Sequence, residues 1–256
     1  MFKFLVSTIL ILNVGCAHWS SKKKEQAGLF LQLGTSQFEN GEYPSALKNL
    51  LQSESLDSTN QQTQNMLGMV YFMRQRYDLS EKHLLRALSL DSRFTEARNN
   101  IGRLYIELKN YPKADEELKK VLDDLTYNGV AKAQINWGLS KFYQKQYTEA
   151  LQAFSQAIQQ ENDNCLAHTM LGRTYFENNN NESAVLALDK AIGFCQKALF
   201  DEPHYYSALS YYRLGDKPRS ISRFKEVVKL YPNGKYNEKS RAMLDLIQKV
   251  EHEKNR

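Results

Sequence analysis

Apolar and small residues recur along this chain with a period close to 34 residues, and each period holds two clusters of them. The first cluster surrounds a glycine, with apolar residues three and four positions apart, which is the spacing of one face of an α-helix. The glycines are Gly34, Gly68, Gly102, Gly138 and Gly172. In the second cluster two small residues flank a large apolar one along one helical face, as in Ala46, Leu50 and Ser53. Each period therefore predicts two amphipathic helices joined by a short turn.

The glycines also set the register of the repeats. If each glycine is position 8, repeats start at residues 27, 61, 95, 131 and 165, and a sixth repeat with Ala208 in that position starts at 201. The predicted repeats are 27–60, 61–94, 95–130, 131–164, 165–200 and 201–234. Pro44, Pro112 and Pro218 all fall at position 18, in the first turn of the second helix, where a missing N–H is tolerated. A glycine inside a helix costs up to about 1 kcal/mol relative to alanine, so these glycines predict helix packing too close for a Cβ.

A helix–turn–helix unit of 34 residues with these features resembles the tetratricopeptide repeat. Tyrosine is frequent at positions 11 and 17, alanine or serine fills position 20, and leucine or phenylalanine fills position 24. The resemblance implies an all-α fold, a right-handed α-solenoid of six tetratricopeptide repeats. Residues 235–251 (KYNEKSRAMLDLIQKVE) predict one more amphipathic helix that caps the apolar end of the stack, and residues 252–256 form a tail.

The N-terminus has the pattern of an export signal. Lys3 is followed by the apolar stretch Phe4–Leu12, which is too short to span a bilayer of about 30 Å. A signal that ends in Gly-Cys resembles a bacterial lipoprotein signal peptide, which implies that residues 1–15 are removed and that Cys16 carries the lipid. An ordinary secretory signal cleaved near Ala17 is the alternative. Residues 16–26 are polar and basic without periodicity, and they predict a flexible tether.

Composition excludes several classes of protein. Of the 256 residues, 42% are apolar and 25% are charged, which argues against both a disordered chain and a protein made of membrane spans. The net charge of +5 falls to +4 when residues 1–15, which include Lys3, are removed. A charge this small gives no strong case for nucleic acid, which usually binds a clustered basic face, so we predict no nucleic-acid partner.

Motifs for catalysis or metal binding are also missing from the sequence. There is no glycine-rich phosphate loop, no HExxH and no CxxC, and the neighbouring Cys165 and His168 lack a third ligand. Among the scattered histidines, His83 falls at an exposed position of a second helix, while His168 and His204 take a packing position of a first helix. We therefore predict no enzymatic activity, no cofactor, no metal and no small-molecule substrate.

Cys165 and Cys195 occupy positions 1 and 31 of the fifth repeat. The two helices of a repeat are antiparallel, so the start of the first lies beside the end of the second. This places the cysteines within reach of the roughly 4.4–6.8 Å between Cα atoms that a disulfide needs. Because an exported protein meets an oxidising compartment, we predict a Cys165–Cys195 disulfide. Two buried free thiols are the alternative.

In tetratricopeptide proteins the first helices line a concave groove, where positions 5, 9 and 12 share one helical face. Position 12 carries a large apolar residue in every repeat. This predicts either an apolar floor for a bound peptide or packing between neighbouring first helices. The first two repeats carry the most groove hydrophobes without compensating charge, so we expect the main contact there. The predicted partner-binding residues are Leu31, Phe38, Asn65, Met69, Phe72, Met73, Asn99, Arg103, Ile106 and Phe142.

The signal, the tether and the six repeats together resemble the type IV pilus biogenesis and stability proteins of the PilF/PilW pilotin family. The resemblance includes the runs EARNNIGRLYIELKNYPKADEELKKVL, DLTYNG and KLYPNGKYNEKSRAML. It implies a non-catalytic lipoprotein, sorted to the outer membrane because no aspartate follows Cys16. There it would bind a secretin subunit and promote its localisation or assembly. The alternative is a periplasm-facing lipoprotein adaptor for cell-wall hydrolases or for outer-membrane protein assembly.

Overall fold

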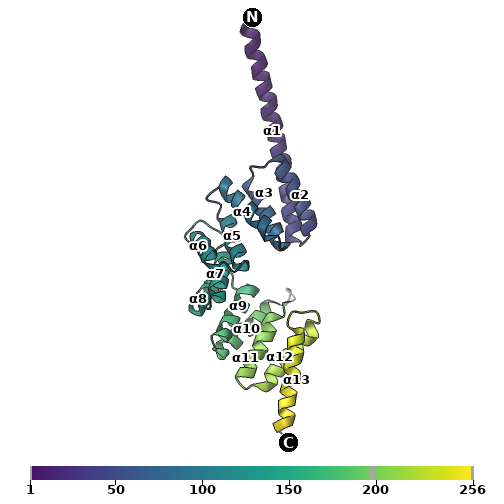
Figure 1. The fold of residues 1–256 in the computed structure, drawn as a ribbon, viewed down its shortest axis with the longest axis vertical. Coiled ribbons are helices and arrows are strands. Elements are labelled where there is room, and N and C mark those ends of the chain that lie inside the picture. The colour runs from purple at the N-terminus through teal and green to yellow at the C-terminus, as the bar shows by residue number, and fades with distance from the viewer. Residues whose placement is uncertain (1, 196–199, 255–256) are drawn as a thin grey trace. The chain divides into compact units, whose positions relative to one another are not determined.

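The computed structural model describes the backbone of residues 2–195 and 200–254, and the side chains of residues 21–195, 200–250 and 253. Over the described residues the chain forms α-helices joined by short turns, with no strand (Figure 1). The helices are α1 (Phe2–Glu39), α2 (Tyr43–Leu56), α3 (Gln61–Met73), α4 (Tyr77–Leu90), α5 (Thr95–Glu107), α6 (Tyr111–Leu122), α7 (Val130–Tyr143), α8 (Tyr147–Gln160), α9 (Cys165–Glu177), α10 (Asn181–Phe194), α11 (Glu202–Arg213), α12 (Lys217–Leu230) and α13 (Asn237–Lys254). The predicted all-α fold is confirmed.

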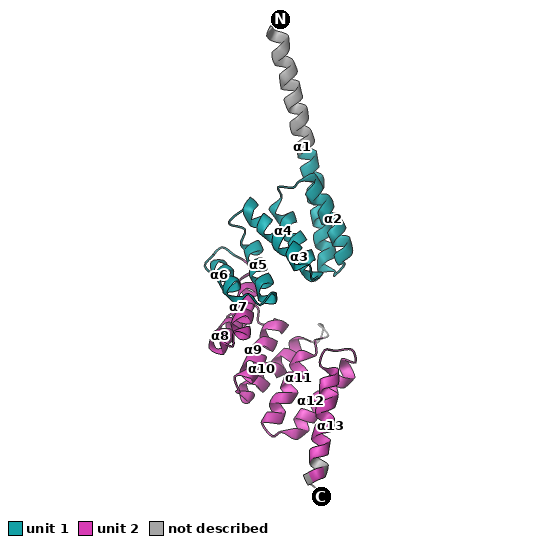
Figure 2. Ribbon diagram, in the orientation of Figure 1, with its two compact units in different colours: residues 1–127 teal, residues 128–256 magenta. Residues whose placement is uncertain are grey.

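The helices form two compact units, Met1–Tyr127 with α1–α6 and Asn128–Arg256 with α7–α13 (Figure 2). In the first unit α1 packs against α2, α3 against α4 and α5 against α6. In the second unit α7 packs against α8, α9 against α10 and α11 against α12. The second helix of every pair begins at position 17 of its repeat. Each helix pair is therefore one repeat of the sequence.

The two helices of every repeat are joined by the same backbone motif. Position 15 has a positive φ in all six repeats, at Gly41, Gln75, Lys109, Lys145, Asn179 and Gly215. Its N–H donates to the carbonyl of position 12, and the next N–H donates to the carbonyl of position 11. These are the two hydrogen bonds of a Schellman helix end. Position 12 therefore lies in the last turn of each first helix.

In the first five repeats the core forms where the glycine of the first helix meets the large residue at position 24. A Cβ added at Gly68 or Gly102 would lie 2.6 Å from the Cγ of Leu84 or Leu118. Both leucines are fully buried. Since carbon atoms in van der Waals contact are about 3.5–4.0 Å apart, only glycine allows the helices this approach, as the sequence predicts.

The structure differs from the prediction just before the first repeat. Residues 21–26, predicted as part of a flexible tether, are helical and continue α1, with exposed side chains. The lysines, Glu25 and Gln26 are good helix formers, and no glycine or proline interrupts them. The packed part of α1 can therefore extend through them, since adding a residue to a helix is easier than starting one. The side chain of Cys16 lies outside the described residues.

The first and last repeats end differently. Leu33, at position 7 of the first repeat, is 49% exposed, whereas Leu67 in the same position of the second repeat is fully buried. In the second unit α13 packs on α12, and its Ile247 is buried with Ala208 and Phe224. This helix lies where the sequence predicts a cap, but it runs to Lys254, so residues 252–254 of the predicted tail are helical. Within the described part of the chain, every helix is too short or too polar to span a membrane.

Candidate partner-binding surfaces

The structure buries six of the ten side chains that the sequence assigns to a partner-binding groove. They are Leu31, Asn65, Met69, Asn99, Ile106 and Phe142. First helices of neighbouring repeats pack together, α1 on α3 and α3 on α5 in the first unit and α7 on α9 in the second. The prediction that these six side chains form an exposed floor of the groove is therefore corrected. They are buried where first helices pack against one another.

In the first, second and fourth repeats the aromatic residue at position 12 packs against the tyrosine at position 17. The ring centroids are 5.6 Å apart for Phe38 and Tyr43, 5.8 Å for Phe72 and Tyr77, and 6.0 Å for Phe142 and Tyr147. Each tyrosine is the first residue of its second helix. The aromatic pair therefore packs across the turn, which explains a large residue at position 12 without a bound partner.

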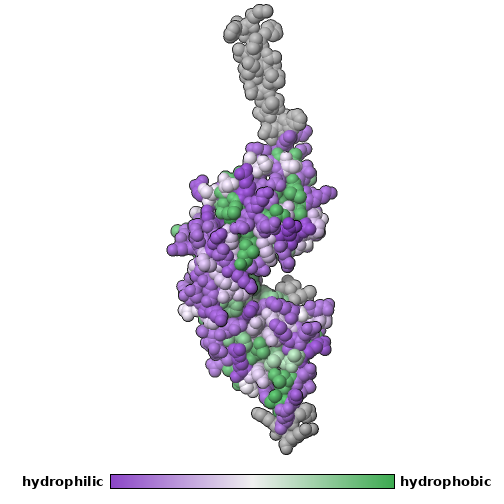
Figure 3. Space-filling view, viewed as in Figure 1, coloured by the Kyte–Doolittle hydropathy of each residue, from purple (hydrophilic) through white to green (hydrophobic). Residues whose placement is uncertain are grey.

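Four of the ten residues reach the surface of the first unit. Phe38 and Phe72 are half-buried, Met73 is 37% exposed, and Arg103 is exposed. The guanidinium of Arg103 lies 4.8 Å from the centroid of the Phe72 ring. Hydrophobic patches are visible among the polar surface of this unit (Figure 3). Apolar surface for a partner thus remains in the first two repeats, over fewer residues than the sequence predicts.

A hydrogen bond of Asn65 joins the second repeat to the third. Its Oδ1 accepts a 2.9 Å hydrogen bond from Nδ2 of Asn100, and both side chains are buried. α3 and α5, which carry the two residues, pack against each other. A buried amide pair of this kind holds neighbouring repeats in one register, because either group left alone would be unsatisfied.

We expect Asn100→Ala to destabilise the first unit by about 1–2 kcal/mol, because Asn65 Oδ1 would be buried without its donor. The double variant Asn65→Ala/Asn100→Ala should cost less than the sum of the single variants, with a coupling energy of about 1 kcal/mol. Urea unfolding of the four proteins measures this coupling. Strictly additive costs would show that the hydrogen bond does not join the repeats.

His83 is buried, so its predicted exposed position is wrong. Its Nδ1 lies 2.8 Å from Oε1 of Gln64, and its ring stacks on Tyr71 with centroids 5.3 Å apart. Burial, the largest influence, lowers the pKa of His83 and favours the neutral imidazole. This face of α4 therefore packs on α3 instead of facing water.

A disulfide joins Cys165, at the start of α9, to Cys195, which follows α10. The two Cα atoms are 5.0 Å apart. The bond links the helices at the end opposite their turn, as the repeat positions predict. Among the described residues no group of three or more His, Cys, Asp or Glu side chains is placed to hold a metal ion.

The second unit contains a hollow of about 670 Å³ that the sequence pattern does not indicate. Its walls come from α9, α11, α13 and the turn before α13. These are the first helices of the fifth and sixth repeats and the capping helix. The hollow therefore lies on first helices, as the predicted contact region does, but in the fifth and sixth repeats instead of the first two.

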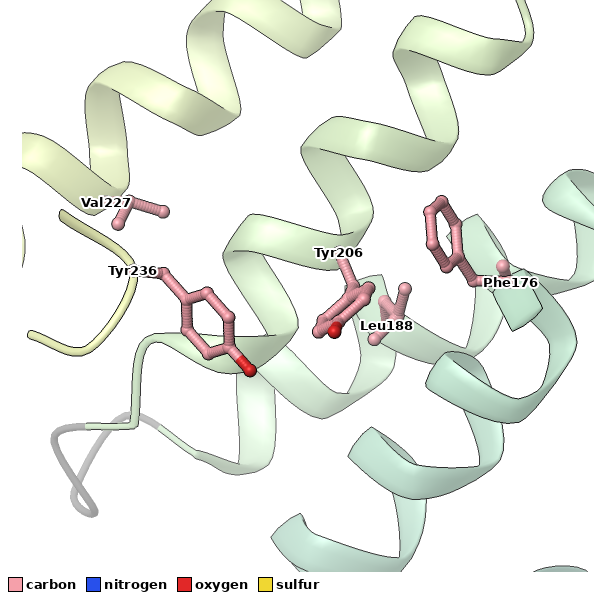
Figure 4. Packing of buried hydrophobic residues seen from close by; sticks show 6 residues of the cluster. Phe176, Leu188, Tyr206, Val227 and Tyr236 are labelled. Atoms are coloured by element: carbon pink, nitrogen blue, oxygen red, sulfur yellow. The ribbon is translucent and has the colours of Figure 1, made fainter. Parts of the chain in front are cut away.

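Buried aromatic rings form the base of this hollow. Phe176, Tyr206 and Tyr236 belong to one core cluster, and Tyr206 lies between the other two rings (Figure 4). Ring centroids are 5.3 Å apart for Phe176 and Tyr206 and 5.8 Å for Tyr206 and Tyr236. Tyr205 stacks on Tyr236 at 4.5 Å. Burial raises the pKa of the Tyr205 and Tyr206 hydroxyls, so both stay protonated at neutral pH.

Cations surround these rings. The Arg213 guanidinium carbon lies 3.6 Å from the Phe176 ring centroid, and the Nζ atoms of Lys235 and Lys239 lie 5.2 and 5.5 Å from that of Tyr236. All three cations are exposed. Deeper in the wall, Nη1 of Arg173 donates a 2.7 Å hydrogen bond to Oε1 of Glu202. The hollow thus combines an aromatic base with a positive rim.

Four family models described as tetratricopeptide repeat match residues 31–93, 95–123, 141–210 and 204–234. The chain is built from tetratricopeptide repeats. Such repeats stack into extended binding surfaces and typically act as non-catalytic scaffolds for protein interactions. No curated protein matches this tetratricopeptide-repeat chain.

Solved structures share the tetratricopeptide-repeat fold at low sequence identity. PilF of Pseudomonas aeruginosa is 18% identical with a TM-score of 0.73, over 87% of this chain and 99% of PilF. PilW, described as a widely conserved type IV pilus biogenesis factor, is 17% identical with a TM-score of 0.76, over 83% of this chain and 97% of PilW. A chain of the APC/C hetero-tetramer Cut9–Hcn1 is 16% identical with a TM-score of 0.76, over 88% of this chain and 44% of its own length.

Proposed function

We propose that this protein is a lipid-anchored scaffold that binds a secretin subunit and promotes its localisation or assembly in the outer membrane for type IV pili. The observation that carries the proposal is the extent of the repeat array. The chain covers 99% of PilF and 97% of PilW, and PilW is described as a type IV pilus biogenesis factor. The chain in Cut9–Hcn1 has the same kind of repeat but is covered over only 44% of its length.

In this proposal residues 1–15 are a lipoprotein signal, Cys16 carries the lipid, and the repeats face the periplasm. The disulfide between Cys165 and Cys195 supports export, because disulfides persist in oxidising compartments and are rare in the cytosol. The lipid would carry the bound subunit along its own sorting route to the outer membrane.

The protein acts by binding, without catalysis. The half-buried Phe38 and Phe72 and the exposed Met73 offer the partner a contact surface in the first two repeats, and the exposed Arg103 of the third repeat borders it. A partly exposed aromatic beside an arginine is a combination that is enriched in protein interfaces. These side chains would cover an apolar segment of the secretin subunit until the ring assembles.

Deleting the gene is expected to abolish secretin multimers in the outer membrane, and a plasmid copy should restore them. Cys16→Ala should fail to incorporate labelled palmitate and should leave secretin monomers outside the outer-membrane fraction. The measurement is immunoblotting of heat-resistant secretin multimers in separated membranes. Normal multimers in the deletion strain would refute the proposed function.

A pair of surface variants separates specific contact from general damage. Met73→Glu places a charge on the proposed contact surface and should lower capture of the secretin by at least about tenfold. Leu186→Glu is the matched control, because Leu186 is 69% exposed on α10 in the second unit. The control should capture secretin as the native chain does. Equal capture by all three proteins would exclude the first two repeats as the contact surface.

A further inference from the structure

We propose that the hollow between α9, α11 and α13 is a second binding site, which takes an extended protein segment carrying a carboxylate beside an aromatic or long aliphatic side chain. The site lies wholly within the second unit. It depends neither on the proposed pilus function nor on the apolar surface of the first unit.

The charged side chains that line the hollow favour a ligand with a carboxylate. Four cations line it, Arg173, Arg213, Lys235 and Lys239, against one acidic side chain, Glu177. Arg173 is already matched by Glu202 behind the wall. In the described part of the chain, Arg213, Lys235 and Lys239 make cation–π contacts and no salt bridge. The rim therefore carries surplus positive charge that a carboxylate would complement.

The aromatic residues at the base of the hollow favour a ligand that has an apolar side chain next to its carboxylate. Below the cations lie Tyr205, Tyr206, Leu209 and Met243, and Tyr236 closes the wall next to α13. A bare anion would leave this apolar area in contact with water, whereas an aromatic or aliphatic side chain would cover it. The Tyr205 hydroxyl, whose pKa is raised by burial, stays protonated and can donate a hydrogen bond to the same ligand.

Contacts within the second unit hold the residues around the hollow in position. The N–H of Tyr236 donates a buried 2.7 Å hydrogen bond to the Asp201 carboxylate, which holds the turn before α13 against the start of α11. Tyr236 stacks on Tyr205, and Ile247 fixes α13 in the core. A wall fixed in this way lowers the ordering cost of binding. The volume of about 670 Å³ is sufficient for a few side chains of a segment.

The test uses the full-length protein in a neutral detergent and a fluorescein-labelled peptide Gly-Ser-Glu-Phe-Glu-Leu-Gly. Fluorescence anisotropy should show at least about tenfold tighter binding than for the same peptide with glutamine in place of glutamate. The affinity should fall as salt is added, because exposed charges are screened. Lys239→Glu should weaken the glutamate peptide about tenfold. Lys225→Glu is the matched control, an exposed lysine on α12 outside the hollow, and it should bind as the native chain does.

Several results would overturn the inference. One is equal affinity for the two peptides, and another is a Lys239→Glu protein that keeps its helical circular dichroism and its full affinity. Absence of glutamate-peptide binding up to about 1 mM would also overturn it. So would self-association that Lys239→Glu abolishes, since that assigns the hollow to a second copy of the chain.

Discussion

Replacing Cys165 and Cys195 together by alanine is expected to lower the free energy of unfolding of the second unit by about 3 kcal/mol. The disulfide joins residues 30 positions apart, so it restricts a long loop of the unfolded chain. In the folded chain it fixes the start of α9 to the end of α10, where Cys195 is 1% exposed. Urea unfolding of residues 21–256, followed by circular dichroism, measures the loss.

Reduction of the native chain provides the control for that experiment. The native protein in a reducing agent should unfold at the urea concentration of the alanine variant, and the variant should not respond to the reducing agent. Because each repeat contacts only its neighbours, amide exchange should rise in α9 and α10 and stay unchanged in α3 and α4. An unchanged unfolding midpoint, or alkylation of both thiols in the unreduced protein, would contradict the prediction.

The repeat register could be read from the sequence because the contacts that set it are local. Gly68 meets Leu84 only 16 positions later, and the same pair of positions recurs at Gly102 and Leu118. Tyrosine at position 17 likewise packs on the residue at position 12, across one turn. Packing constraints that repeat within about 20 residues leave a periodic signal in composition, and this signal predicted the helix pairs.

The positive φ of the turn between the two helices leaves a weaker signal in the sequence. Position 15 adopts a positive φ in every repeat, but only Gly41 and Gly215 are glycines there. Gln75, Lys109 and Lys145 take the same conformation although side chains disfavour it. The two Schellman hydrogen bonds and the packing of the helix pair impose this conformation. Composition alone therefore does not mark the position.

The candidate sites were harder to predict than the fold. A hydrophobic residue in every repeat, as at position 12, has the same pattern whether it lines a groove or packs between helices, and the structure shows packing for Ile106 and Phe142. The hollow of the second unit shows the opposite difficulty. Its side chains come from α9, α11 and α13, and residues such as Tyr236 and Lys239 belong to no repeat. A search for periodicity cannot find a site made of non-repeating residues.

Gly172→Ala is expected to destabilise the second unit by about 2 kcal/mol, although alanine favours helices over glycine by up to about 1 kcal/mol. The new Cβ would lie 2.5 Å from Cγ and 3.1 Å from the backbone N of Leu188. The Cγ is a branch point of a fully buried side chain, and the backbone N is fixed in α10. Neither atom can retreat unless α10 moves away from α9, which is why overpacking should outweigh the gain in helix propensity.

Gly193→Ala separates the two effects, because Gly193 also lies in α10 and a Cβ there would meet nothing within 4 Å. It should stabilise the unit by up to about 1 kcal/mol, so the two substitutions should shift the urea midpoint in opposite directions. Adding Leu188→Ala to Gly172→Ala should cost less than Leu188→Ala costs alone, because the new methyl group then fills part of the cavity. If Gly172→Ala stabilised the protein as Gly193→Ala does, the glycine at position 8 would not be required by close packing. The register of the repeats would then need a different physical explanation.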